Sequence, residues 1–142
     1  MMRLVLYIVI MGGMLTTADA QDLKRHKWKQ RILVVYTDSE SNEKFSKQVE
    51  ELQFNLQGLH DRKLLVYQVI KDQVKTGLDS EGERTPIAVF SNEYAPHKEA
   101  FEIQLIGLDG GLKLRQHEVL SLEKLFETID QMPMRRREMR EN

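Results

Sequence analysis

Arg31–Thr37, with the sequence RILVVYT, and Lys63–Val69, with the sequence KLLVYQV, are the two stretches that decide the fold of this chain. Each is a short, nearly continuous apolar run rich in β-branched residues, which is typical of a strand buried on both faces. Between them, apolar residues recur at helical spacing: Phe45, Val49, Leu52, Leu56 and Leu59. The order strand, helix, strand predicts a βαβ unit with parallel pairing and a right-handed crossover.

The last third of the chain predicts a hairpin and a helix. Phe101, Ile103 and Leu105 alternate with polar residues, and Asp109–Gly110 separates this run from a second apolar run at residues 112–115. An Asp-Gly pair between two such runs is the strongest short-range signal for antiparallel strands. Ser121 is placed to cap a final helix that Pro133 closes, and its apolar face consists of Leu122, Leu125, Phe126, Ile129 and Met132.

Between these halves, residues 71–84 are charged and lack a sustained period, which predicts a solvated excursion. Thr85 followed by Pro86 is typical of a helix N-cap, and it favours a short helix over the next residues, although Ile87–Phe90 fits a strand equally well. A parallel βαβ half followed by a ββα half predicts an α/β fold of the thioredoxin-like type, with a mixed central sheet flanked by helices.

Residues 1–20 have the layout of a secretory signal peptide. Arg3 precedes an apolar run from Leu4 to Leu15, and Ala18-Asp19-Ala20 has the small-x-small pattern of a cleavage site. The alternative is an uncleaved anchor, but the run is short for crossing a bilayer. We therefore expect an exported protein, periplasmic or secreted in a bacterium and extracellular in a eukaryote, with a single domain over residues 21–142.

The chain of 142 residues contains no cysteine, which removes every thiol mechanism. It also lacks a Gly-x-Ser-x-Gly motif, a Gly-rich phosphate loop and a His-Glu-x-x-His motif. Its four histidines do not have the short spacing of zinc ligands. The sequence therefore indicates no catalytic residue, no metal site and no cofactor.

Charge gathers at the two ends of the mature chain. Gln21–Arg31 carries five basic residues against one acidic residue, and Met132–Asn142 carries four against two, although the formal net charge is only −1. Such ends can attract an anionic glycan, lipid or protein, or they can serve only as solvated ends; no nucleic-acid partner is expected. The candidate binding residues are Trp28, Lys29, Arg31, Arg135, Arg136 and Arg137.

Two of these positions leave alternatives open. Trp28, the only tryptophan, can stack on a sugar from its basic segment, or it can pack over the edge of the sheet and fasten the N-terminal segment. At the other end, Met134 and Met139 can fold back on the core and leave Arg135–Arg137 outward, or the tail can fray.

Three segments resemble a known protein family: WKQR at Trp28–Arg31, IGLDGGLKLR at Ile106–Arg115 and IDQMPMRRREM at Ile129–Met139. The family is the domain of unknown function 4174. Its members are mostly small exported bacterial proteins, and related domains occur in extracellular sushi-repeat-containing proteins of vertebrates. The resemblance implies a thioredoxin- or peroxiredoxin-like domain and supplies no catalytic residues.

In thioredoxin-like enzymes the reactive thiol lies where the first strand meets the first helix, which corresponds to residues 37–42 here. Ser39 and Ser41 stand in this stretch, but a serine without an adjacent base is neither a nucleophile near neutral pH nor a two-electron reductant. The proline that those enzymes place before the next central strand is missing directly ahead of Phe101.

We therefore expect a non-catalytic domain that acts as a binding or interaction module. The alternatives are an enzyme that uses Asp38, Glu40 or Asp109 in acid–base chemistry, and an envelope protein held by its basic ends to anionic glycans or lipids. Whether the three carboxylates converge in one pocket separates the enzyme from the binding module.

Overall fold

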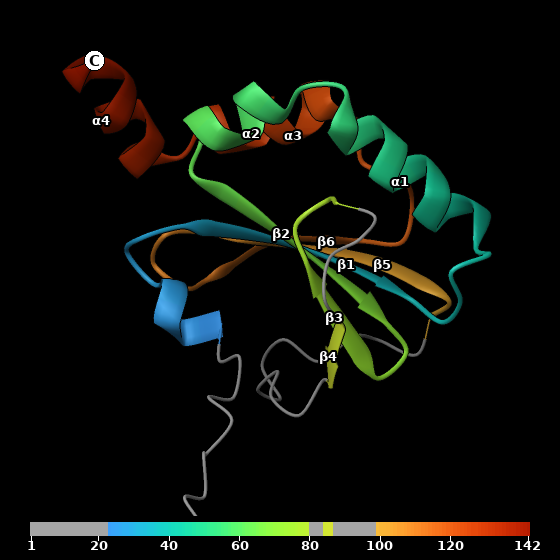
Figure 1. The fold of residues 1–142 in the computed structure, drawn as a ribbon. Helices are drawn as coiled ribbons and strands as arrows, with labels where there is room; N and C mark the ends of the chain where they lie inside the picture. Colours follow the sequence, from blue (N-terminus) through green and yellow to red (C-terminus); the bar gives the residue numbers. More distant parts are fainter. Residues whose placement is uncertain (1–22, 80–83, 87–98) are drawn as a thin grey trace, which may run out of the picture.

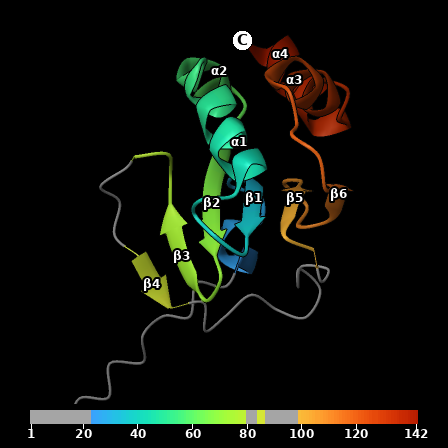
Figure 2. The same ribbon diagram turned by 90° about the vertical axis from the view of Figure 1, so that its right-hand side faces the viewer.

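The computed structural model describes residues 23–79, 84–86 and 99–142. One sheet of six strands runs in the order β4-β3-β2-β1-β5-β6 (Figure 2). The strands are β1 Arg31–Thr37, β2 Leu64–Ile70, β3 Gln73–Thr76, β4 Arg84–Pro86, β5 Phe101–Ile106 and β6 Leu112–Gln116. β1 and β2 pair in parallel, and the other neighbours pair antiparallel. This mixed sheet confirms the predicted βαβ unit and the thioredoxin-like class.

Helices cover the two faces of the sheet unequally. α1 Glu43–Gln53, α2 Leu56–Asp61 and α3 Leu122–Asp130 lie over one face, whereas the short 3-10 helix η1, Leu23–His26, lies on the other side (Figure 1). Leu33 of β1 belongs to the core under the helices, and Val34 belongs to a second core that includes Leu23. Every residue of β1 is buried, which explains the continuous apolar run of this strand.

The predicted single helix after β1 is wrong in one respect, because it is broken between α1 and α2. The Asn55 side chain accepts a hydrogen bond from the Gly58 N–H and caps α2, so it competes with continuation of α1. Leu56, expected on the buried face, is 56% exposed as a result, and Phe54 is 75% exposed.

The solvated excursion predicted for residues 71–84 is also wrong, since it contains β3 and the start of β4. Lys71, with φ of 55°, and Asp72 form the two-residue turn between β2 and β3. The turn carries neither Gly nor Asn at the left-handed position, so its usual signal is absent.

The predicted helix start at Thr85 and Pro86 is wrong too, because both residues belong to β4. β4 is an edge strand, and there a proline without an N–H is tolerated. The rest of that predicted element, from Ile87 onward, lies outside the described residues.

The hairpin and the cap of the last predicted helix are confirmed. Gly110 has φ of 79° in the turn between β5 and β6, and the Ser121 side chain caps α3. α3 ends at Asp130, but Pro133 does not simply close it: it is the first residue of another helix, α4, Pro133–Glu141. The basic tail is therefore helical. In the part of the chain that the structure describes, no helix is long and apolar enough to cross a membrane.

Candidate functional site

The loop between β1 and α1 occupies the position where thioredoxin-like enzymes carry their thiol. The Thr37 hydroxyl donates to the Ser39 carbonyl at 2.7 Å, and the Ser39 and Ser41 hydroxyls lie 2.8 Å apart. The Asn42 side chain accepts from the Phe45 N–H and caps α1. The hydroxyl and amide side chains of the loop thus bond mainly within it or to the first turn of α1, and these bonds place no base against either serine.

A pocket of about 300 Å³ lies beside this loop, and it is lined by Asn42, Glu43, Lys44, Glu99, Ala100, Phe101 and His117. His117 Nε2 is 3.1 Å from Oε1 of Glu102, which is fully buried, and Arg115 Nε is 3.6 Å from the same oxygen. Lys44 Nζ donates to Glu118 at 2.7 Å. Burial, together with the negative charge of Glu102, raises the pKa of Tyr36 above its ordinary value. The charges around this pocket are therefore mostly committed to one another.

At the opposite end of β1, a charged cluster ties α4 to the body of the protein. Arg31 is 1% exposed, and its Nη1 and Nη2 donate to the two carboxylate oxygens of Glu138 at 3.2 and 3.3 Å. Arg31 Nη1 also donates to the Arg62 carbonyl at 2.8 Å. Lys63 Nζ approaches Glu138 at 3.8 Å, so this carboxylate is the hub of the cluster.

Asp130 is a second hub beside the first. It accepts from Arg62 at 2.9 and 3.0 Å and from Arg135 Nε at 3.1 Å, and Arg135 Nη1 donates to the Asp61 carbonyl at 3.0 Å. Burial by itself would raise the pKa of Asp130, but the hydrogen bonds from Arg62 and Arg135 outweigh it and hold this pKa below its ordinary value.

The structure differs from both expectations for the C-terminal tail. The tail forms a helix and does not fray, and Arg135, not Met134 or Met139, packs against the body of the protein. Arg135 is buried, while Met134 is 37% and Met139 is 43% exposed, because Arg135 turns toward hydrogen-bond partners on α2 and α3, the Asp61 carbonyl and the Asp130 carboxylate. Arg31 and Arg135 therefore hold the fold together and are not part of an exposed basic surface. Arg136 and Arg137 remain exposed.

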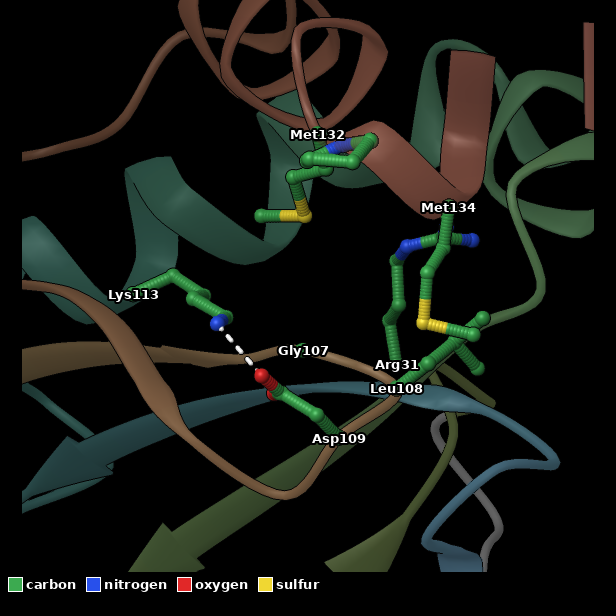
Figure 3. Close-up of a pocket in the computed structure, with 8 residues that line it drawn as sticks. Arg31, Gly107, Leu108, Asp109, Lys113, Met132 and Met134 are labelled. Atoms are coloured by element: carbon green, nitrogen blue, oxygen red, sulfur yellow. Dashed lines mark hydrogen bonds and ion pairs between the residues drawn. The ribbon is translucent and has the colours of Figure 1, made fainter. Parts of the chain in front are cut away.

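A cavity of about 290 Å³ opens next to this cluster, between the β5–β6 turn and the turn that joins α3 to α4 (Figure 3). Its lining consists of Arg31, Gly107, Leu108, Asp109, Lys113, Met132, Pro133 and Met134. Lys113 Nζ donates to Asp109 at 2.8 Å, and this bond, followed by that from the Gly111 N–H, lowers the pKa of Asp109. The other side chains that line the cavity are apolar, apart from Arg31.

Trp28 lies at the same end of the sheet. Its backbone N–H donates to the Leu108 carbonyl at 2.6 Å, and this bond attaches the segment before β1 to the β5–β6 turn. The residue is 60% exposed and lies outside both core clusters, with Lys27 Nζ 5.3 Å from the centre of the indole ring. Trp28 has φ of 69°, a left-handed conformation that is strained for a bulky residue.

Lys29, which follows Trp28 in the sequence, lines a pocket together with Lys63. The pocket has a volume of about 520 Å³ and is lined by Lys29, Gln30, His60, Asp61, Lys63 and Leu64. Lys63 is also left-handed, with φ of 51°, at the end of α2. We refer to Lys27, Trp28, Lys29, His60 and Lys63 as the amino-end basic surface.

The carboxylates considered for acid–base chemistry do not meet. Asp38 and Glu40 are exposed in the loop after β1, whereas Asp109 follows Ile106, which pairs with Ile32 near the start of β1. They thus lie at opposite ends of the sheet, so the geometry does not assemble them into one catalytic site.

A sequence model of the family described as "Domain of unknown function (DUF4174)" matches residues 22–138. The chain belongs to this family. A search among curated proteins gives no match for it. Among solved structures, the reduced 2-Cys peroxiredoxin of Plasmodium vivax is similar, with a TM-score of 0.54 and 11% sequence identity over 81% of this chain and 72% of that chain. At that identity the likeness is one of fold.

The three segments that resemble the DUF4174 family meet at the amino end of β1. The backbone of Trp28 binds that of Leu108, and Arg31 binds Glu138, so all three segments are joined through these two contacts. The sequence analysis missed Glu138, Asp130 and Lys63 as members of this end. The runs of basic residues indicated the arginines at this end of β1, but no local pattern indicated the carboxylates that bind them.

Proposed function

We propose that this member of the DUF4174 family is an exported binding domain without thiol chemistry, and that it binds an anionic glycan on the amino-end basic surface. The observation that carries the proposal is Trp28. A large aromatic residue is held in a strained backbone conformation, yet it is 60% exposed and does not belong to either core cluster. Strain that the fold maintains without a packing gain is typical of functional positions.

The surroundings of Trp28 fit a charged sugar chain. An aromatic face stacks on the apolar face of a sugar ring. Lys27 and Lys29 on either side of Trp28 in the sequence, and Lys63 in the same pocket as Lys29, supply point charges for carboxylate or sulfate groups. Lys29 and Lys63 line the same shallow pocket, which leaves room for a chain to lie across it. Arg136 and Arg137 are exposed on α4, whose Glu138 approaches Lys63, so they extend the positive charge.

Retention on immobilised heparin and on polygalacturonate tests this proposal. The protein should be retained at low salt, and elution should need less salt after Trp28→Ala or after the double change Lys29→Gln with Lys63→Gln. The matched control is Lys71→Gln with Lys124→Gln, which removes two exposed lysines elsewhere and should elute close to the wild type.

Two outcomes would reject the glycan. If Trp28→Ala does not change retention, the amino-end basic surface is not the glycan-binding site. Binding to phosphatidylglycerol vesicles in the absence of retention on either polysaccharide would replace the glycan with a lipid. Export is tested separately: the N-terminal residue of the exported form should be Gln21, and recovery of the intact chain with Met1 in the membrane fraction would contradict cleavage.

A further inference from the structure

The cavity between the β5–β6 turn and the α3–α4 turn is large enough for a small molecule. Its volume of about 290 Å³ lies near the lower end of the ~300–1,000 Å³ of ligand pockets. An apolar cavity of about 150 Å³ holds benzene, so this one has room for a benzene ring with a polar substituent. Leu108, Met132, Pro133 and Met134 give it an apolar wall.

Arg31 lines this cavity and retains an unused donor. Its Nη atoms are bound to Glu138 and to the Arg62 carbonyl, but its Nε N–H has no acceptor among the residues that the structure describes, although the side chain is 1% exposed. A buried donor without an acceptor is unfavourable, and the cost is larger on a charged group. A ligand oxygen at this wall would supply the missing acceptor.

The charge around Arg31 favours an anionic oxygen. The cluster joins four cations, Arg31, Arg62, Lys63 and Arg135, to only two carboxylates, Asp130 and Glu138. Asp109 does not offset the excess, since it is paired with Lys113. A carboxylate bound beside Arg31 would reduce the positive charge of this partly buried cluster.

Met134 lies beside Arg31 in this cavity. Figure 3 shows Met134 reaching down from α4 and Arg31 reaching up from β1 into the same part of the cavity. Met134 is 37% exposed and has three rotatable side-chain bonds, so it can swing aside without disturbing the core.

We propose that this cavity binds a small monocarboxylate with an apolar body, whose carboxylate accepts a hydrogen bond from Arg31 Nε while its body packs against Leu108, Met132 and Pro133. This site does not depend on the glycan proposal, because its ligand chemistry and its residues are different.

Benzoate is the probe, and benzyl alcohol is its uncharged counterpart of similar size. In titrations followed by ¹H–¹⁵N spectra of the full chain, benzoate should shift the Arg31 Nε–H resonance and bind at least tenfold more tightly than benzyl alcohol. Equal affinities, or an Arg31 Nε–H resonance that does not move at saturation, would overturn the proposal.

A filled cavity gives an independent test. Met134→Trp should weaken benzoate binding at least tenfold, whereas Met139→Trp, a change at the other exposed methionine of α4, should leave it unchanged. Unchanged binding in Met134→Trp would overturn the site. Retention of the same variants on heparin shows separately whether the glycan surface is intact. If Met134→Trp does not fold, the shift of the Arg31 Nε–H resonance in the wild type tests the benzoate site by itself.

Discussion

The two ends of β1 differ in how they use polar residues. At its carboxyl end, the loop to α1 is exposed, and its serine, threonine and asparagine side chains bond mainly within the loop. At its amino end, the buried Arg31 and Arg135 are paired with the partly buried Glu138 and Asp130, beside a cavity and a strained tryptophan. The thioredoxin-like scaffold is present, but the ion pairs that bind α4 to the body lie at the end opposite to the thiol position, whereas the buried carboxylate near the thiol position, Glu102, is bound by His117 and Arg115.

The difference shows why fold alone does not locate function in this chain. A loop with internally satisfied hydroxyls contributes little to stability and offers no activated group. Buried charges cost desolvation energy and require specific partners, so the fold retains them only where the surrounding structure is well defined. The predictions that follow change one end at a time.

Glu138→Gln should have the largest effect. The change removes the charge that balances Arg31 and leaves a cation that is 1% exposed without its carboxylate. Breaking a buried pair from one side costs about 3–5 kcal/mol of unfolding free energy. Urea unfolding measures it, with Glu141→Gln, an exposed glutamate on the same helix, as the control. A loss below about 1 kcal/mol would show that α4 is not locked by Glu138.

Asp130→Asn tests the same end through pH. The pKa of Asp130 is lowered in the folded state, so its contribution is present above the unfolded pKa of about 3.9 and is lost as pH falls through the folded pKa. We expect the variant to be less stable by about 2 kcal/mol at pH 7, with the gap to the wild type closing at acid pH. A gap that is independent of pH would assign the loss to packing.

The sequence predicted the carboxyl end of β1 and the central strands well, because continuous apolar runs and capping residues are local signals. It did not predict β3, where Val74 is buried but the left-handed turn at Lys71 lacks its usual glycine or asparagine. It also predicted one continuous helix where the structure has α1 and α2. Asn55 caps α2, but an asparagine can also stand within a longer helix, so its presence did not signal the break.

At the amino end, the sequence identified Arg31 and Arg135 but not their roles. Arg31 binds a carboxylate 107 residues away, and Arg135 binds a carbonyl 74 residues away. Pairing over such separations leaves no local pattern, so charge composition indicated an exposed surface where the fold builds a buried cluster. Trp28 was left with two alternatives, an indole that stacks on a sugar and one that packs over the edge of the sheet, because its basic context is compatible with both.

Lys63→Gly should raise stability slightly. Lys63 adopts φ of 51° at the end of α2, where glycine is favoured, and its contact with Glu138 is long, at 3.8 Å. The expected gain is about 1 kcal/mol, and Lys71→Gly, with φ of 55° in the β2–β3 turn, should gain a similar amount. Only Lys63→Gly should also lower the salt needed to elute the protein from heparin. A loss of heparin retention in both variants would argue against a local role for Lys63.

The smallest effect is expected at the carboxyl end, where Ser39→Ala combined with Ser41→Ala should change the unfolding free energy by less than about 0.5 kcal/mol. The two hydroxyls bond to each other near solvent, so water can replace the pair when it is removed. Asn42→Ala in the same loop gives the scale, because it removes the N-cap of α1 and should cost about 1 kcal/mol. Neither change should alter heparin retention or benzoate binding. If the serine double variant instead loses more stability than Asn42→Ala, or weakens either ligand, the loop at the thiol position is a constrained site in its own right and the contrast between the two ends of β1 fails.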